Sequence, residues 1–175
     1  ASGQKKIGLA KRPEDIPRRQ AIAAVGQPGL ILEYEKAFGV YDIKVAQILL
    51  TGDDLTASRD RYLNARNTLN TLLSWKIVPI INENDTVVVE EIKFGDNDNL
   101  SAMIALLMNA DLLINLTDID GLYTGDPRTH TDAKLISEVE AIDESIEKIA
   151  GDIPGTLGTG GMLSKVRAGA KVTAA

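Results

Sequence analysis

Hydrophobic and polar positions along the chain predict strands and helices that alternate. Buried strands are expected at residues 44–51, 77–82 and 111–117, where apolar runs end in polar or turn-forming residues. Apolar residues at helical spacing predict helices at residues 18–38, 59–75, 99–109 and 143–150, with a last helix after a glycine-rich turn at 155–161. Within the first of these helices, Gly26, Pro28 and Gly29 predict a bend or a break.

Strands that are apolar throughout, each followed by a helix, are typical of a parallel sheet covered on both faces. The pattern therefore predicts an α/β fold, and the order of its strands stays open. Two smaller features are expected beside this sheet, a hairpin at residues 86–94 and a short strand at 135–136. No linker or repeat interrupts the pattern, so residues 1–175 are expected to belong to one domain.

Composition excludes several classes of protein. Of the 175 residues, 44% are apolar and 25% are charged, which excludes a disordered chain, and the longest apolar stretch, Ala102–Met108, is too short to span a membrane. The absence of cysteine excludes disulfides and zinc sites built on thiolates. The single histidine, His130, lies in a polar run and is expected in a loop, so a Ser-His-Asp hydrolase is set aside.

Charge argues against a nucleic-acid partner. The formal net charge is −6, and basic residues gather in one short cluster that is expected to be a solvated loop and helix start. This cluster comprises Lys5, Lys6, Lys11, Arg12, Arg18 and Arg19.

The chain starts without Met or a signal peptide and stops inside an alanine-rich helical pattern, so we expect a piece of a cytoplasmic protein.

Two polar clusters lie where parallel sheets bind ligands, next to strand ends and helix starts. Residues 82–85 (Asn-Glu-Asn-Asp) follow a predicted strand; Asn82 and Glu83 fit an ordinary turn, whereas Asn84 and Asp85 could bind an ammonium group. Residues 95–98 (Gly-Asp-Asn-Asp) precede a predicted helix. Asp98 is well placed as its N-cap, but capping does not explain the whole run.

Two further clusters suit a nucleotide. Thr117 and Asp118 end the third predicted strand, where they can contact a sugar or phosphates, although a tight turn around Gly121 is the simpler interpretation. The glycines of residues 158–161 can turn backbone N–H groups toward an anion, and Lys165 in the following helix can neutralise phosphoryl charge. Neither a P-loop nor a Gly-x-Gly-x-x-Gly motif is present.

Five runs together resemble the glutamate 5-kinases of the amino-acid kinase family. These runs are residues 24–27 (AVGQ), 63–68 (LNARNT), 79–85 (PIINEND), 94–102 (FGDNDNLSA) and 158–162 (GTGGM). The resemblance implies a three-layer α/β/α sandwich around a mainly parallel sheet, incomplete at both ends. It also implies ATP-dependent phosphorylation of the side-chain carboxylate of L-glutamate, the first step of proline biosynthesis, with ATP and Mg²⁺ as cofactors and no metal site made by the protein itself.

The resemblance also implies roles for single residues. Ser2, Asp85 and Asn97, together with Asn84, are implied as glutamate binders, Lys165 as the transition-state cation, and Asp98 as the residue that organises the catalytic lysines. The nucleotide contacts implied are Thr117, Asp118, Thr159, Gly160, Gly161, Met162, Leu163, Ser164 and Lys165. Family members have a further phosphate-binding lysine in a loop that would precede Ala1, so the chain alone could be inactive.

Other interpretations stay open at this point. The chain could be an acetylglutamate, aspartate or uridylate kinase, although the INEND and GDNDN runs speak against these. It could also be a non-catalytic nucleotide or amino-acid sensor, against which the retained Lys165 argues. The family resemblance also implies that the protein forms a homo-oligomer and that proline could inhibit it by feedback.

Overall fold

The structure is a computed structural model that describes residues 2–11, 13–88, 96–151 and 161–174. Contacts divide the chain into two compact units, a first unit at Ala1–Phe94 and a second unit at Gly95–Ala175. Among the described residues, no helix is long and apolar enough to cross a membrane.

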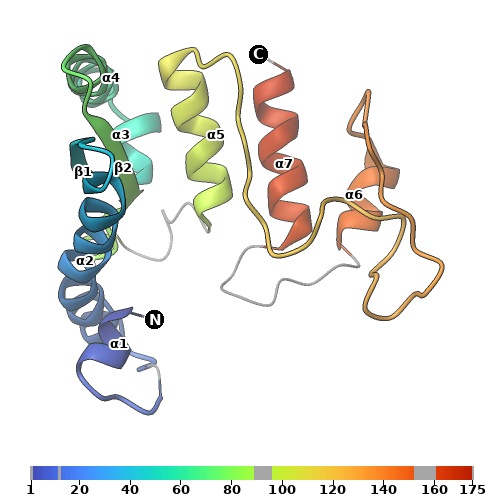
Figure 1. The fold of residues 1–175 in the computed structure, drawn as a ribbon, viewed down its shortest axis with the longest axis horizontal. Helices are drawn as coiled ribbons and strands as arrows, with labels where there is room; N and C mark the ends of the chain where they lie inside the picture. Colours follow the sequence, from blue (N-terminus) through green and yellow to red (C-terminus); the bar gives the residue numbers. More distant parts are fainter. Residues whose placement is uncertain (1, 12, 89–95, 152–160, 175) are drawn as a thin grey trace. The chain divides into compact units, whose positions relative to one another are not determined.

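The first unit is built around two parallel strands (Figure 1). Its elements are α1 (Ser2–Lys6), α2 (Ile16–Gly39), β1 (Val45–Leu50), α3 (Gly52–Thr56), α4 (Arg59–Ser74) and β2 (Val78–Glu83). The strands pair in register from Val45 opposite Val78 to Leu50 opposite Glu83, and α4 connects them as the crossover helix. The predicted α/β class with parallel strands is therefore confirmed.

The break predicted within α2 is wrong, because the helix runs without interruption from Ile16 to Gly39. Pro28 has no N–H to donate to the carbonyl of Ala24 one turn earlier. Both residues lie on the exposed side of α2, where water can solvate that carbonyl. The helix therefore tolerates the proline. The missing hydrogen bond would destabilise the helix more if the carbonyl of Ala24 were buried.

The second unit contains α5 (Asn97–Met108), α6 (Glu144–Gly151) and α7 (Met162–Thr173). Helix α7 packs against both α5 and α6, and Figure 1 shows α5 and α7 side by side. Apolar residues buried in this unit are Leu100, Ala102, Leu107, Ala150, Met162 and Ala168.

The strand predicted at residues 111–117 is wrong in this structure. The segment pairs with no strand among the described residues, and Leu112, Ile114 and Leu116 have exposed fractions of 73%, 69% and 89%. A strand exists through hydrogen bonds to a neighbouring strand, and the described part of the second unit holds none that could flank this segment. An apolar composition alone was therefore not enough to predict a strand at residues 111–117.

The remaining expectations are met in part. Residues 85–87 form a turn instead of the start of a hairpin, and residues 89–94 lie outside the described part. The short strand expected at 135–136 is an isolated antiparallel bridge between Tyr123 and Leu135. Helices α1 and α3 were not predicted. A capping box at Thr51 starts α3: the Thr51 side chain accepts from the Asp54 backbone N–H, and the Asp54 carboxylate accepts from the Thr51 N–H.

Candidate functional site

A cavity of about 440 Å³ lies in the first unit, between α1, α2 and the residues that follow β2. This volume is within the usual range for small-molecule sites. The cavity is lined by Ser2, Gly3, Gln4, Ile16, Arg19, Gln20, Ile22, Ala23, Gly26, Gln27, Leu30, Asn82, Asp85 and Val88. Two of the predicted glutamate binders, Ser2 and Asp85, are thus brought to one cavity.

Close contact between glycines holds Ser2 at this cavity. A Cβ placed on Gly3 would lie 1.9 Å from the carbonyl oxygen of Ile22, and one placed on Gly26 would lie 2.8 Å from the backbone N of Gly3. Neither distance is sterically possible, so only glycine allows α1 to lie this close to α2. The Ser-Gly pair, which meant nothing by sequence alone, has a structural reason here.

The cluster at the end of β2 divides between the cavity and a turn. Asp85 and Asn82 line the cavity, whereas Asn84 is absent from its lining. The Asn84 backbone N–H donates to Leu50 (2.8 Å), its carbonyl accepts from Val87, and its side-chain oxygen accepts from Thr86. Asn84 therefore supports the turn that presents Asp85, and Asn82, which fitted an ordinary turn, lines the cavity instead.

Arg19 is a cavity residue that the sequence did not reveal. It was expected in a solvated basic cluster, but it is half-buried and lines the same cavity as Asp85. A carboxylate and a guanidinium in the lining of one cavity complement the ammonium and the carboxylate of a free amino acid. The signal that could have identified Arg19 is helical spacing, because Ile16, Arg19, Ala23 and Gly26 share one face of α2.

A second polar cluster lies in the second unit, where α5 and α7 begin. The Lys165 ammonium lies 3.0 Å and 3.1 Å from the two carboxylate oxygens of Asp98. Ser164 donates to the same carboxylate at 2.5 Å. The side chains of Lys165 and Asp98 are only 21% and 16% exposed, so the pair is largely shielded from water. The structure thus brings together both residues that the resemblance implied to be catalytic.

The prediction that Asp98 caps α5 is wrong. Helix α5 begins two residues earlier than expected, and its cap is Asp96, which accepts a hydrogen bond from the Asn99 N–H at 2.8 Å. Asp98 lies inside the first turn, where its side chain is available to Lys165. The two acidic residues of the run therefore have different roles: Asp96 caps α5, and Asp98 belongs to the polar cluster with Lys165. Asn97, the remaining predicted glutamate binder, starts α5 in the second unit.

The start of α7 differs from the starts of α2 to α6. Side chains cap α2, α3, α4, α5 and α6, through Asp15, Thr51, Ser58, Asp96 and Asp143 respectively. At α7 the cap residue is Gly161, which has no side chain to offer. The first N–H groups of α7 are thus suited to an anion.

The predicted nucleotide segments pack together in the second unit. Met162 and Ala150 form a small core, and packed against it are Ile119, Leu122, Tyr123, Leu163 and Val166. The loop after Thr117 and Asp118 is thereby held against the start of α7, and the hydroxyl of Thr117 donates to Asp118 (3.4 Å). The side chains of Met162 and Leu163 serve packing, which leaves their backbone for ligand contacts. Thr159 and Gly160 lie outside the described residues.

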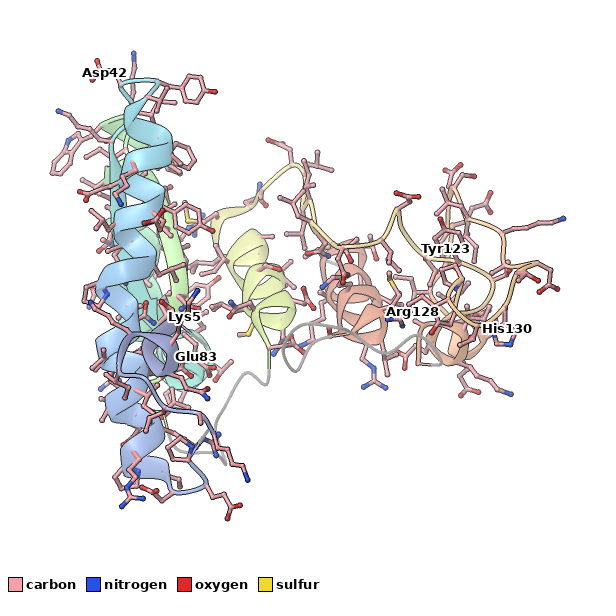
Figure 2. The ribbon with its side chains drawn as sticks, turned by 60° about the horizontal axis from the view of Figure 1, so that its bottom comes forward. Lys5, Asp42, Glu83, Tyr123, Arg128 and His130 are labelled. Atoms are coloured by element: carbon pink, nitrogen blue, oxygen red, sulfur yellow. The ribbon has the colours of Figure 1, made fainter. Side chains whose placement is uncertain are left out.

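A turn at residues 126–130 is held by hydrogen bonds to Asp126. Arg128 donates to both carboxylate oxygens of Asp126 (2.9 and 3.0 Å), and these hydrogen bonds hold the pKa of Asp126 below its ordinary value. Figure 2 labels Arg128 and His130 on this turn and Tyr123 on the loop before it. Burial, followed by the charge of Asp120, raises the pKa of Tyr123, whose hydroxyl donates to Asp120 at 3.3 Å. His130 is exposed in the loop, as predicted.

Comparison with known proteins identifies the family. The model of the amino acid kinase family matches residues 2–174. The chain belongs to the amino acid kinase family. Its relatives include proteins named glutamate 5-kinase from Meiothermus ruber, 61% identical over 100% of this chain, and from Citrifermentans bemidjiense, 57% identical over 98% of it. A third, from Azoarcus sp., is 56% identical over 96% of the chain.

This amino acid kinase chain spans about half the length of those relatives, 46%, 46% and 45% respectively. Within the described ranges, the structure holds no group of three or more His, Cys, Asp or Glu side chains that could bind a metal ion. Family membership and the parallel strands agree with the fold class that the resemblance implied.

Proposed function

We propose that the protein phosphorylates the γ-carboxylate of L-glutamate with ATP and forms γ-glutamyl phosphate, as the first step of proline biosynthesis. The observation that carries this proposal is the Asp98–Lys165–Ser164 cluster at the uncapped start of α7, in a chain 61% identical to a protein named glutamate 5-kinase. Acetylglutamate, aspartate and uridylate kinases remain the alternatives within the family.

Glutamate is proposed to bind through the cavity of the first unit. Asp85 would hold the α-ammonium group, and Ser2 would contact the substrate from the start of α1, which Gly3 and Gly26 allow to lie close to α2. Asn97 of the second unit is proposed as a further glutamate ligand, and Asn84 as a residue that acts through the turn it supports. A free amino acid carries an ammonium group and a carboxylate group. The acidic and the basic residue in the lining of this cavity can neutralise these two charges.

Phosphoryl transfer is proposed to use the second unit. Bound ATP would supply the phosphoryl group together with Mg²⁺, which prefers phosphate oxygens and water to a full set of protein ligands. The N–H groups at the start of α7 would hold phosphate oxygens, and Lys165 would neutralise the charge that develops on the transferred group. Thr117 and Asp118 are proposed to contact the nucleoside side, and residues 159–165 to surround the phosphates.

No strong base is needed for this reaction. The attacking group is a carboxylate that is already ionised, so positioning and charge neutralisation are sufficient. Asp98 holds the ammonium of Lys165 with two hydrogen bonds and so fixes the place where that charge acts. Asp98 is accordingly a positioning residue for Lys165.

The test is acyl-phosphate trapping. The full-length protein is incubated with Mg-ATP and hydroxylamine, and hydroxamate formation from glutamate is compared with that from aspartate and N-acetylglutamate. A signal that is specific to glutamate is expected. A stronger signal from either of the other acids would refute the substrate, and binding of ATP and glutamate without hydroxamate would favour a sensor.

Exchange of Asp85 tests the cavity. Asp85→Ala should abolish glutamate use in the same assay, because it leaves the α-ammonium without its counter-charge. Asp53→Ala, an acidic exchange in the first turn of α3 and away from the cavity lining, is the matched control. Unchanged glutamate kinetics in Asp85→Ala would refute the assignment of the cavity.

The remaining features are proposed from the sequence and, for the oligomer and the inhibition by proline, from the family resemblance. They are a cytoplasmic location, homo-oligomer formation, feedback inhibition by proline, no nucleic-acid binding by this part, and one domain for residues 1–175. Size-exclusion chromatography with light scattering measures the oligomer, and titration of proline in the hydroxamate assay measures the inhibition.

A further inference from the structure

Ser164 has an unusual position in the polar cluster of the second unit. It is the third residue of α7, and its hydroxyl lies 2.5 Å from Oδ2 of Asp98 on α5. The next residue, Lys165, reaches both oxygens of the same carboxylate. Two consecutive residues of one helix therefore bind one aspartate of another helix.

The Ser164 hydroxyl donates its hydrogen to the carboxylate of Asp98. The hydroxyl also lies 2.8 Å from the carbonyl oxygen of Gly161, so two acceptors compete for one proton. The Gly161 carbonyl already receives the backbone N–H of Lys165, at 3.5 Å. Asp98 is the nearer of the two acceptors, at 2.5 Å against 2.8 Å for Gly161, so the serine donates to Asp98.

This hydrogen bond fixes a torsion that is otherwise soft. The carboxylate of an aspartate turns about χ2 in a broad, two-fold potential. Lys165 alone does not fix that torsion, because its ammonium has three equivalent donors at the end of a flexible side chain. The short bond from the helix-borne Ser164 does fix it, because the serine side chain has a single heavy-atom torsion.

We infer that Ser164 is a positioning residue that orients the Asp98 carboxylate and, through it, the ammonium of Lys165. The family resemblance implied that Ser164 is a nucleotide contact, which would touch a phosphate directly. The two roles differ in a measurable way, because a serine that acts through Asp98 has no effect once the carboxylate is gone. This inference rests on the proposed kinase function.

A double-mutant cycle in the full-length protein tests the inference. Ser164→Ala is expected to lower kcat for hydroxamate formation about tenfold with little change in the KM for ATP, which is the result for an interaction that serves only the transition state. In an Asp98→Asn background the same exchange is expected to change kcat less than about twofold. Ser164→Thr, which keeps the hydroxyl, should restore most of the activity.

The controls separate this inference from the proposed function. Thr173→Ala removes another hydroxyl of α7, one that bonds only to its own helix at Gly169 and Ala170, and should leave kcat unchanged. A wild-type protein without kinase activity would overturn the proposed function. With an active wild type, the inference fails if Ser164→Ala has full activity, if it raises mainly the KM for ATP, or if its loss persists undiminished in Asp98→Asn.

Discussion

The contact between Gly3 and Gly26 makes a sharp prediction, because α2 contains a second glycine that serves as its control. A Cβ on Gly26 would lie 2.8 Å from the backbone N and 3.2 Å from the Cα of Gly3, so Gly26→Ala must push α1 away from α2. A Cβ on Gly29 would meet only the hydroxyl of Ser2, at 3.8 Å, which is an ordinary contact. Both substitutions lie in the same helix and add one methyl group.

The two variants should therefore differ in sign. Alanine in a helix interior is favoured over glycine by about 1 kcal/mol, which Gly29→Ala should gain in full. Gly26→Ala gains the same amount but loses about 1–3 kcal/mol to overpacking, so it should be destabilised by up to about 2 kcal/mol. We expect the free energy of unfolding of the two variants to differ by roughly 1–3 kcal/mol, in favour of Gly29→Ala.

Urea unfolding measures this difference through the midpoint at unchanged slope. The KM for glutamate provides the functional measurement. In Gly26→Ala the displacement of α1 away from α2 also moves Ser2, which lines the cavity. We expect Gly26→Ala to raise this KM and Gly29→Ala to change it less. If Gly26→Ala were as stable as Gly29→Ala, the close approach of α1 to α2 would be refuted.

Two further predictions concern the second unit. Leu107 is 1% exposed in α5, so Leu107→Ala should lower the free energy of unfolding by about 2–5 kcal/mol in urea. Leu106→Ala, at a side chain that is 40% exposed, should cost about 1 kcal/mol or less, and equal losses would contradict the burial. Arg128 holds the folded-state pKa of Asp126 below its unfolded value, so the stability from this pair is present above the unfolded pKa and is lost as pH falls through the folded one. Asp126→Asn should therefore be less stable at neutral pH and lose less on acidification, as urea midpoints between pH 7 and pH 3 would show; parallel losses in both proteins would contradict the pair.

Sequence patterns predicted the elements whose signal is local. Strands β1 and β2 and helix α4 lie within one or two residues of their predicted bounds, because apolar runs and helical spacing are properties of the segment itself. The cap of α5 was misplaced by two residues because the run contains two aspartates, and the sequence does not tell which of them starts the helix.

Non-local features escaped the sequence. Whether residues 111–117 form a strand depends on a neighbour elsewhere in the chain. Whether Pro28 breaks a helix depends on which side of the helix faces water. Arg19 was missed because helical spacing shows which face of α2 it lies on, whereas only the segments packed along that face make it the wall of a cavity.

One contact within the candidate site agrees with the family resemblance, whereas the roles of the site residues stay predictions. Asp98 and Lys165 were paired by resemblance alone, and the structure places them in direct contact. The charge-bearing residues of a site are constrained by chemistry, so they can be identified from residue type and order. Residues that support them sterically, such as Gly3 and Gly26, give no chemical signal and were visible only in three dimensions.

The exposed segment at residues 112–116 has a consequence for handling the protein in solution. Its sequence, Leu-Leu-Ile-Asn-Leu, carries no charge and no proline, and three of its side chains are more than two-thirds exposed. Uncharged, extended, apolar stretches with free edges template pairing with a second chain and nucleate aggregates. We expect the isolated chain to precipitate at high concentration, and a lysine in place of Ile114 to act as a gatekeeper that keeps it in solution.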